Sequence, residues 1–207
     1  MSIQDGTYFY EPASGHGLPH DPFKAIVAPR PIGWISTRDR EGRANLAPYS
    51  FFAAFNSNPP IIGFSSEGYK DSVRNAEATG EFVANLATKA LAAAMNRTSA
   101  AVEAGVDEMR LAGLAAAPCR LVAAPRVAAS PAALECKLLQ VLRLRDLEGR
   151  ELSSHLVLGQ VVGVHIDPRY LVDGRFDLVA AQPIMRAGYS DDYVEIGRMF
   201  GMTRPTS

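Results

Sequence analysis

Four side chains that can bind a phosphate lie close together in the sequence, at Ser65, Ser66, Lys70 and Ser72. The hydroxyls donate hydrogen bonds, and the ammonium supplies a positive charge. A helix is predicted to begin directly after them, and the free backbone N–H groups at a helix start attract anions. The cluster therefore indicates an anion site, with phosphate as the preferred ligand. The same residues would also suit an ordinary turn followed by a capped helix, and this alternative stays open.

An aromatic-rich segment precedes the cluster and could hold a flat ring. It begins with a loop at 45–50, and Phe51 and Phe52 follow. Aromatic and apolar walls bind planar ligands through large contact areas. In the alternative, Pro48 merely breaks a strand, and the polar residues on either side cap the break. Together, the two segments predict a site for a phosphorylated, planar cofactor.

Other common catalytic and binding motifs do not occur in the sequence. The four histidines stand at positions 16, 20, 155 and 165, and no Gly-x-Ser-x-Gly sequence is found, so no Ser–His–acid triad is indicated. There is no P-loop, and no Gly-x-Gly-x-x-Gly follows a strand, which argues against a dinucleotide-binding domain. His155 and His165 share one predicted strand but stand roughly 33 Å apart at ~3.3 Å per residue, too far to share a metal ion. We therefore assign neither a metal site nor a catalytic side chain from the sequence.

The composition is that of an ordinary globular protein with one main domain. The 207 residues are 47% hydrophobic and 21% charged, which allows a large core without cross-links. Basic and acidic residues balance at 21 and 22, so no nucleic-acid surface and no anionic membrane surface is indicated. Cys119 and Cys136 form no CxxC motif and are expected to be reduced thiols. Because neither a signal sequence nor a membrane-spanning apolar run is found, we expect a cytoplasmic protein.

The elements that would position the cluster are mostly strands. Alternation of apolar and polar residues predicts strands at 32–37, 44–47, 81–87, 134–145 and 154–166. The last two form a long antiparallel ribbon, which favours a closed barrel over an open sheet because its edges need cover. A short helix is predicted at 71–78, capped by Asp71 and ended by Gly80. Alanine-rich helices are predicted at 88–96 and over 98–117, the second interrupted by Gly105 and Gly113.

Both ends of the chain are predicted to lie outside this framework. Residues 1–22 are rich in Gly, Pro and His without periodicity, and we interpret them as an arm on the surface or on a partner. Residues 23–180 form the predicted domain. Residues 181–207 form a tail whose aromatic and basic residues, such as Arg186 and Tyr193, indicate docking on the barrel or on a partner subunit.

Several short motifs occur in order along the chain. They are Pro-Arg-Pro-Ile-Gly-Trp-Ile-Ser-Thr at 29–37, Asn-Leu-Ala-Pro-Tyr-Ser-Phe-Phe at 45–52, Pro-Pro at 59–60 and Lys-Asp-Ser at 70–72. This series resembles the flavin reductase-like, FMN-binding split-barrel family, and within it the flavoredoxin-like branch. An ordered series is more specific than any single motif. Where the family usually has Lys-Asp-Thr, this chain has Ser72, which keeps the hydroxyl. The segment 98–118 carries no matching motif.

The resemblance implies a mainly β fold, a six-stranded antiparallel split barrel with Greek-key connections and helical cover. It also implies a homodimer with one FMN per subunit near the interface. The 45–52 segment should line the isoalloxazine ring, and the 65–72 cluster should surround the ribityl phosphate. The implied cofactor-binding residues are Asn45, Ala47, Pro48, Tyr49, Ser50, Phe51, Phe52, Ser65, Ser66, Lys70, Asp71 and Ser72.

The function implied is that of a flavoprotein oxidoreductase. It would pass hydride from NADH or NADPH through FMN to an acceptor, such as a partner oxygenase or another redox protein. The flavin would supply the redox chemistry, which agrees with the lack of a catalytic side chain in the sequence. One alternative is an electron carrier that holds FMN without nicotinamide activity, since no nucleotide fingerprint is present. Another is a barrel without cofactor that serves as a structural or interaction domain.

Overall fold

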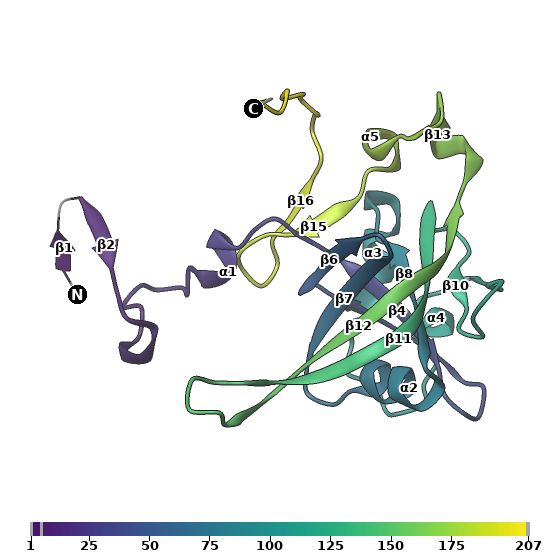
Figure 1. The fold of residues 1–207 in the computed structure, drawn as a ribbon, viewed down its shortest axis with the longest axis horizontal. Coiled ribbons are helices and arrows are strands. Elements are labelled where there is room, and N and C mark those ends of the chain that lie inside the picture. Colours follow the sequence, from purple (N-terminus) through teal and green to yellow (C-terminus); the bar gives the residue numbers. More distant parts are fainter. Residues whose placement is uncertain (1, 5, 206–207) are drawn as a thin grey trace.

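The computed structural model describes residues 2–4 and 6–205, and the seven longest strands of this part form one antiparallel sheet (Figure 1). These strands are β4 Gly33–Arg38, β5 Ala44–Tyr49, β6 Phe52–Ser57, β7 Pro60–Glu67, β8 Glu81–Leu86, β11 Ala132–Arg145 and β12 Glu151–Ile166. Their order across the sheet is β5-β4-β8-β11-β12-β7-β6, with every neighbouring pair antiparallel. The predicted mainly β architecture is confirmed, although the sheet of the described residues has seven strands instead of six.

The sheet curls until its two edge strands, β5 and β6, approach each other. Ser50 and Phe51 alone separate these strands in sequence. Inside the sheet, Tyr49 of β5 contacts Phe64 of β7, with ring centroids 4.7 Å apart, and Phe64 contacts Phe82 of β8 at 5.5 Å. Because these strands are not neighbours in the sheet, their contact across the interior shows that the sheet encloses one core.

The strands β4 and β5 are buried on both faces. Ile35 belongs to the interior core, whereas Trp34 packs on the opposite face of β4 against helical cover. Trp34 is fully buried, and its Nε1 donates a hydrogen bond to Thr98 Oγ1 at 2.9 Å. The cover comes from a short 3-10 turn, η2 Lys89–Leu91, and the helices α3 Ala92–Arg97 and α4 Glu108–Leu111.

Helix α2, Asp71–Thr79, packs against β4 and confirms the helix predicted at 71–78. Its end at Gly80 is also confirmed, with φ 75° in the left-handed region that glycine tolerates. The prediction that Asp71 caps the helix is wrong. Lys70 occupies the capping position with no side-chain cap, and Asp71 forms an ion pair with Arg74 at 2.6 Å instead.

The long helix predicted over 98–117 is also wrong. Within that segment the structure contains only the four-residue helix α4 and the short strand β9 Ala116–Ala117, which pairs with β10 Arg126–Val127. Gly105, in a turn before α4, and Gly113, just after α4, take positive φ values of 85° and 70°, which do not continue a helix. The high alanine content favoured a helix, but the glycine conformations prevent one from continuing.

The two ends carry more regular structure than the sequence predicts. In the arm, β1 Ser2–Gln4 and β2 Thr7–Phe9 form a hairpin that stands away from the barrel, followed by η1 Pro12–Ser14 (Figure 1). The tail forms β15 Ile184–Arg186 and β16 Tyr193–Glu195, and β15 pairs with β3 Arg30–Pro31. The remaining short elements are α1 Phe23–Ile26, η3 Pro168–Tyr170, β13 Leu171–Val172, β14 Arg175–Phe176 and α5 Leu178–Ala181.

Candidate functional site

Three cavities adjoin one another where β5 ends and the sheet splits. We name them the Lys70 cavity, the Arg186 cavity and the Phe51 cavity, each after a residue that lines it. Pro48 borders both the Lys70 and the Arg186 cavity, and Ser50 borders both the Arg186 and the Phe51 cavity. Their volumes are about 340, 340 and 480 Å³. The row of cavities follows the segment that the sequence singled out for a planar ligand.

The Lys70 cavity brings together the two segments that the sequence analysis joined. The predicted residues that line it are Asn45, Ala47, Pro48, Tyr49, Lys70, Asp71 and Ser72. Residues 98–102 and Glu108 complete its wall. The Lys70 side chain is exposed, and within the described part of the chain its ammonium has no ion-pair partner. A free cation beside the first N–H groups of α2 makes this cavity suitable for an anion.

A buried hydrogen-bond network lies beneath this cavity. Asn45 Nδ2 donates to Ser72 Oγ at 2.9 Å and to Thr37 Oγ1 at 3.3 Å. Asn75 Nδ2 donates to the same Thr37 oxygen at 3.1 Å. Burial raises the pKa of Tyr49, and hydrogen bonds with the Ser72 and Ser66 hydroxyls oppose that rise only partly, so the phenol stays neutral. Asn45 and Ser72 therefore fix the start of α2 against β5.

Glu108 is a wall residue that sequence reasoning missed. It sits in the segment without family motifs, directly after Asp107, which caps α4 by accepting from the backbone N–H groups of Met109 and Arg110. Its carboxylate is buried and accepts a hydrogen bond from Leu46 N at 2.9 Å. Burial is the main reason that the pKa of Glu108 is raised. The only signal in the sequence was a helix cap, which reveals nothing of the contact with β5.

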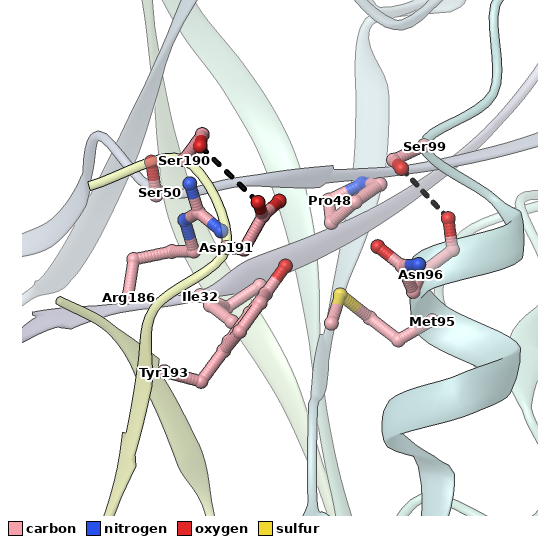
Figure 2. Close-up of a pocket in the computed structure, with 10 residues that line it drawn as sticks. All are labelled: Ile32, Pro48, Ser50, Met95, Asn96, Ser99, Arg186, Ser190, Asp191 and Tyr193. Atoms are coloured by element: carbon pink, nitrogen blue, oxygen red, sulfur yellow. Dashed lines mark hydrogen bonds between the residues drawn. The ribbon is translucent and has the colours of Figure 1, made fainter.

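The Arg186 cavity is walled on one side by the C-terminal tail (Figure 2). Arg186 lies over the Tyr193 ring, with its Cζ 4.6 Å from the ring centroid, and both residues border the cavity. Met95 and Asn96 of α3 line the opposite side, and Ile32 also borders the cavity. The sequence predicted that the tail docks but did not assign Arg186, Tyr193, Met95 or Asn96 to a binding site.

The Phe51 cavity is largely apolar and is lined by four of the predicted residues, Ser50, Phe51, Phe52 and Ser65. Arg30 also lines it and is buried, with its Cζ 5.8 Å from the Phe51 ring centroid. Burial, and then the nearby charge of Arg186, lower the pKa of Arg30. Its guanidinium donates to the backbone carbonyls of residues 24, 27 and 187, and so ties β3 to α1 and to the tail.

The serine cluster does not converge on a single site. Ser65 and Ser66 belong to β7, where successive side chains point to opposite faces. Ser65 faces the Phe51 cavity, whereas Ser66 is fully buried and its Oγ donates to the carbonyl oxygen of Gly68 at 2.9 Å. Neither residue lines the Lys70 cavity. The sequence analysis grouped these serines into one anion-binding cluster and did not anticipate the alternation.

Residues 27–177 match the family model described as flavin reductase like domain. The chain belongs to the flavin reductase-like family. An uncharacterized protein of Deinococcus radiodurans is 37% identical over 193 residues, which cover 84% of this chain and 82% of the relative. The structure of nitrilotriacetate monooxygenase component B from Bacillus cereus is similar with a TM-score of 0.86 and 28% identity, over 96% of this chain and 100% of that chain.

Flavoredoxin of Desulfovibrio vulgaris (Miyazaki F) shares the fold, with a TM-score of 0.75 and 23% identity over 84% of this chain and 90% of that chain. The resemblance drawn from the ordered motifs is thus confirmed, as is the split-barrel fold that it implied. Among the described residues, no helix has the length and apolar character that a membrane crossing requires.

Replacing Glu108 with glutamine should flatten the pH dependence of stability. The pKa of this carboxyl is higher in the folded state than in the unfolded state. The carboxyl therefore contributes most to stability when the pH is below its unfolded-state pKa, and this contribution is lost as the pH rises through its folded-state pKa. We predict that the stability of Glu108→Gln relative to the unmodified protein increases as the pH rises from the ordinary pKa of a glutamate through the raised pKa of the folded state. Urea unfolding at several pH values measures this difference. Glu103→Gln, at an exposed position of the same segment, is the control, and an identical pH profile for both variants would contradict the prediction.

Proposed function

We propose that this protein binds FMN in the Lys70 and Arg186 cavities and reduces it with NADH or NADPH. The observation that carries the proposal is the exposed Lys70 ammonium at the start of α2, which has no ion-pair partner among the described residues. A phosphate there would also accept hydrogen bonds from the backbone N–H groups of Asp71 and Ser72, because the N–H groups in the first turn of a helix have no partners within the helix. The Asp71 carboxylate would not repel it strongly, because Arg74 already forms an ion pair with it.

The neighbouring Arg186 cavity fits the ring end of the same ligand. Pro48 borders both cavities, so a ligand that spans them passes along this residue. Ile32 and Met95 supply apolar surface, and Tyr193 closes the cavity from the tail. When bound, the flavin supplies hydride transfer, while these residues orient the ring and exclude water from it. The positive charge of Arg186 suits a second anionic group, as in a nicotinamide nucleotide.

The Phe51 cavity is proposed as part of a homodimer interface. Ile26, Val27, Phe51 and Phe55 all border it, and their exposed fractions are 75%, 48%, 44% and 54%. An exposed apolar patch of this kind at a cavity is typical of a protein interface. Since Ser50 joins this cavity to the Arg186 cavity, a second subunit placed here would stand beside the flavin. The proposed roles of Phe51, Phe52 and Ser65 are therefore at the interface.

The acceptor of the electrons is proposed to be an oxygenase or another redox protein. The similar structure from Bacillus cereus is described as a component of a monooxygenase. Free passage of reduced FMN to such a partner requires a site that is open on one side. The exposed Lys70 and the tail residues that border the cavities meet that requirement.

Charge reversal at Lys70 should weaken FMN binding. We predict that Lys70→Glu raises the Kd for FMN by about tenfold to a hundredfold, because a charge-assisted hydrogen bond contributes about 1.5–3 kcal/mol. Quenching of FMN fluorescence on titration with protein measures the Kd. Lys89→Glu is the matched control, since Lys89 is also exposed, lines none of the three cavities and pairs with Glu195 only at 3.6 Å. Equal affinities of the two variants would reject the phosphate site.

Anaerobic mixing of the FMN-loaded protein with NADH or NADPH tests the reaction. We expect the visible absorption band of the flavin to bleach with at least one of the two nucleotides. Reduction by dithionite but by neither nucleotide would reject hydride transfer and favour an electron carrier. A protein that binds no FMN would instead indicate a barrel with a structural or interaction role.

Substitution at the apolar patch tests the dimer. We predict that Phe55→Arg raises the Kd of dimerisation at least about tenfold, or ~1.4 kcal/mol, because it places a charge in an apolar contact. Analytical ultracentrifugation over a range of concentrations measures this constant. Leu111→Arg, at an exposed position that does not line the Phe51 cavity, should leave it unchanged. A monomeric unmodified protein would overturn this part of the proposal.

A further inference from the structure

Three side chains of metal-binding type meet away from the row of cavities. They are Cys119 of the segment before β10, Glu135 of β11 and His165 of β12. One ligand atom from each lies within 4.8 Å of the other two. None of the three residues lines the Lys70, Arg186 or Phe51 cavity. The sequence contains no spacing motif for such a group, because the three residues come from separate segments.

The Glu135 carboxylate is held in place by the backbone of the 118–125 segment. It is 1% exposed, and it accepts hydrogen bonds from the N–H groups of Arg120, Leu121 and Val122 at 2.9, 2.6 and 3.1 Å. These bonds fix the orientation of the carboxylate and hold the segment that carries Cys119 against the barrel. Outer contacts of this kind orient the ligands of metal sites and tune their basicity.

His165 approaches the same carboxylate from the neighbouring strand. Its Nε2 lies 2.5 Å from Glu135 Oε1, and 20% of its side chain is exposed. Gly163 stands opposite Glu135 in the register of β11 and β12, and a Cβ atom there would lie 3.2 Å from the Glu135 carboxyl carbon. The absence of a side chain at Gly163 therefore leaves Glu135 the room it occupies beside His165.

A zinc ion matches this combination of donor atoms. Thiolate sulfur, carboxylate oxygen and imidazole nitrogen are its usual ligands, at about 2.0–2.3 Å. Tetrahedral ligands at these distances stand roughly 3.3–3.8 Å apart. Glu135 Oε1 and His165 Nε2, 2.5 Å apart, must therefore separate by somewhat less than ~1 Å, and the Cys119 sulfur, which lies within 4.8 Å of both, must adjust to the same ligand spacing. Sulfur and nitrogen ligands disfavour magnesium and calcium, which prefer all-oxygen sites.

We propose that Cys119, Glu135 and His165 form a zinc-binding site, with water as the fourth ligand on the partly exposed side. The ion would lie between Glu135 Oε1 and His165 Nε2 and replace their direct contact, while the backbone hydrogen bonds to the carboxylate remain. Cys119 would bind as the thiolate and release its proton to solvent. The site would fasten the 118–125 segment to the ribbon of β11 and β12, next to the small core formed by Val83, Val122, Ala124 and Ala133.

Cobalt substitution of the full-length, metal-stripped protein tests the site directly. We expect one Co²⁺ per chain, with a thiolate-to-cobalt charge-transfer band and the intense visible bands of four-coordinate cobalt, both removed by added Zn²⁺. Cys119→Ser should lose the charge-transfer band and bind the ion at least about tenfold more weakly. His155→Asn is the matched control, because His155 lies on the same strand and next to Tyr69, and it should behave as the unmodified protein.

Thermal unfolding provides a second measurement that does not depend on how well a variant folds. Zn²⁺ added to the unmodified protein should raise its Tm, because an ion bound by the folded state stabilises that state. No stoichiometric Co²⁺ binding, an unchanged cobalt spectrum in Cys119→Ser, or equal loss of binding in His155→Asn would each overturn the proposal. A Tm that does not respond to Zn²⁺ would overturn it as well.

Discussion

The buried hydroxyl of Thr37 is the contact on which the geometry of the Lys70 cavity depends. Asn45 of β5 and Asn75 of α2 both donate to it, and Asn45 also donates to Ser72. A buried amide left without a partner costs about 1–3 kcal/mol, so this network favours one placement of α2 against β5. The start of α2, with Lys70 before it, is thereby brought beside Pro48, although the two are far apart in sequence.

The other walls of the cavities are each tied to the barrel by a specific buried contact. Trp34 Nε1 donates a hydrogen bond to Thr98 Oγ1, and the Glu108 carboxylate accepts one from Leu46 N. These two bonds keep the segment around α4 against β4 and β5. Arg30 binds the carbonyl oxygen of Ala187 and thus keeps the tail beside β3. The site is therefore formed by loops and helices that cannot move far from the split in the sheet. Rigid elements of this kind preserve the geometry of a binding site.

The sequence predicted the features that depend on local pattern. Alternation identified the long ribbon, and the glycine after α2 marked its end. What it missed depends on conformation or on distant contacts. The left-handed Gly105 and Gly113 prevent the long helix that alanine favours. Ser65 and Ser66 were grouped because they are neighbours in sequence, yet a strand separates neighbours to opposite faces. No local pattern could reveal that Arg186 reaches the cavity.

Charge balance explains how an acidic cavity wall can still suit a phosphate. Both Asp71 and Glu108 line the Lys70 cavity, and two free carboxylates there would cancel the attraction of one ammonium. Asp71, however, forms an ion pair with Arg74, and burial raises the pKa of Glu108, which weakens its tendency to carry a negative charge. The cation of Lys70 then remains uncompensated at the mouth of the cavity, and an anionic ligand supplies the missing charge more readily than any side chain nearby.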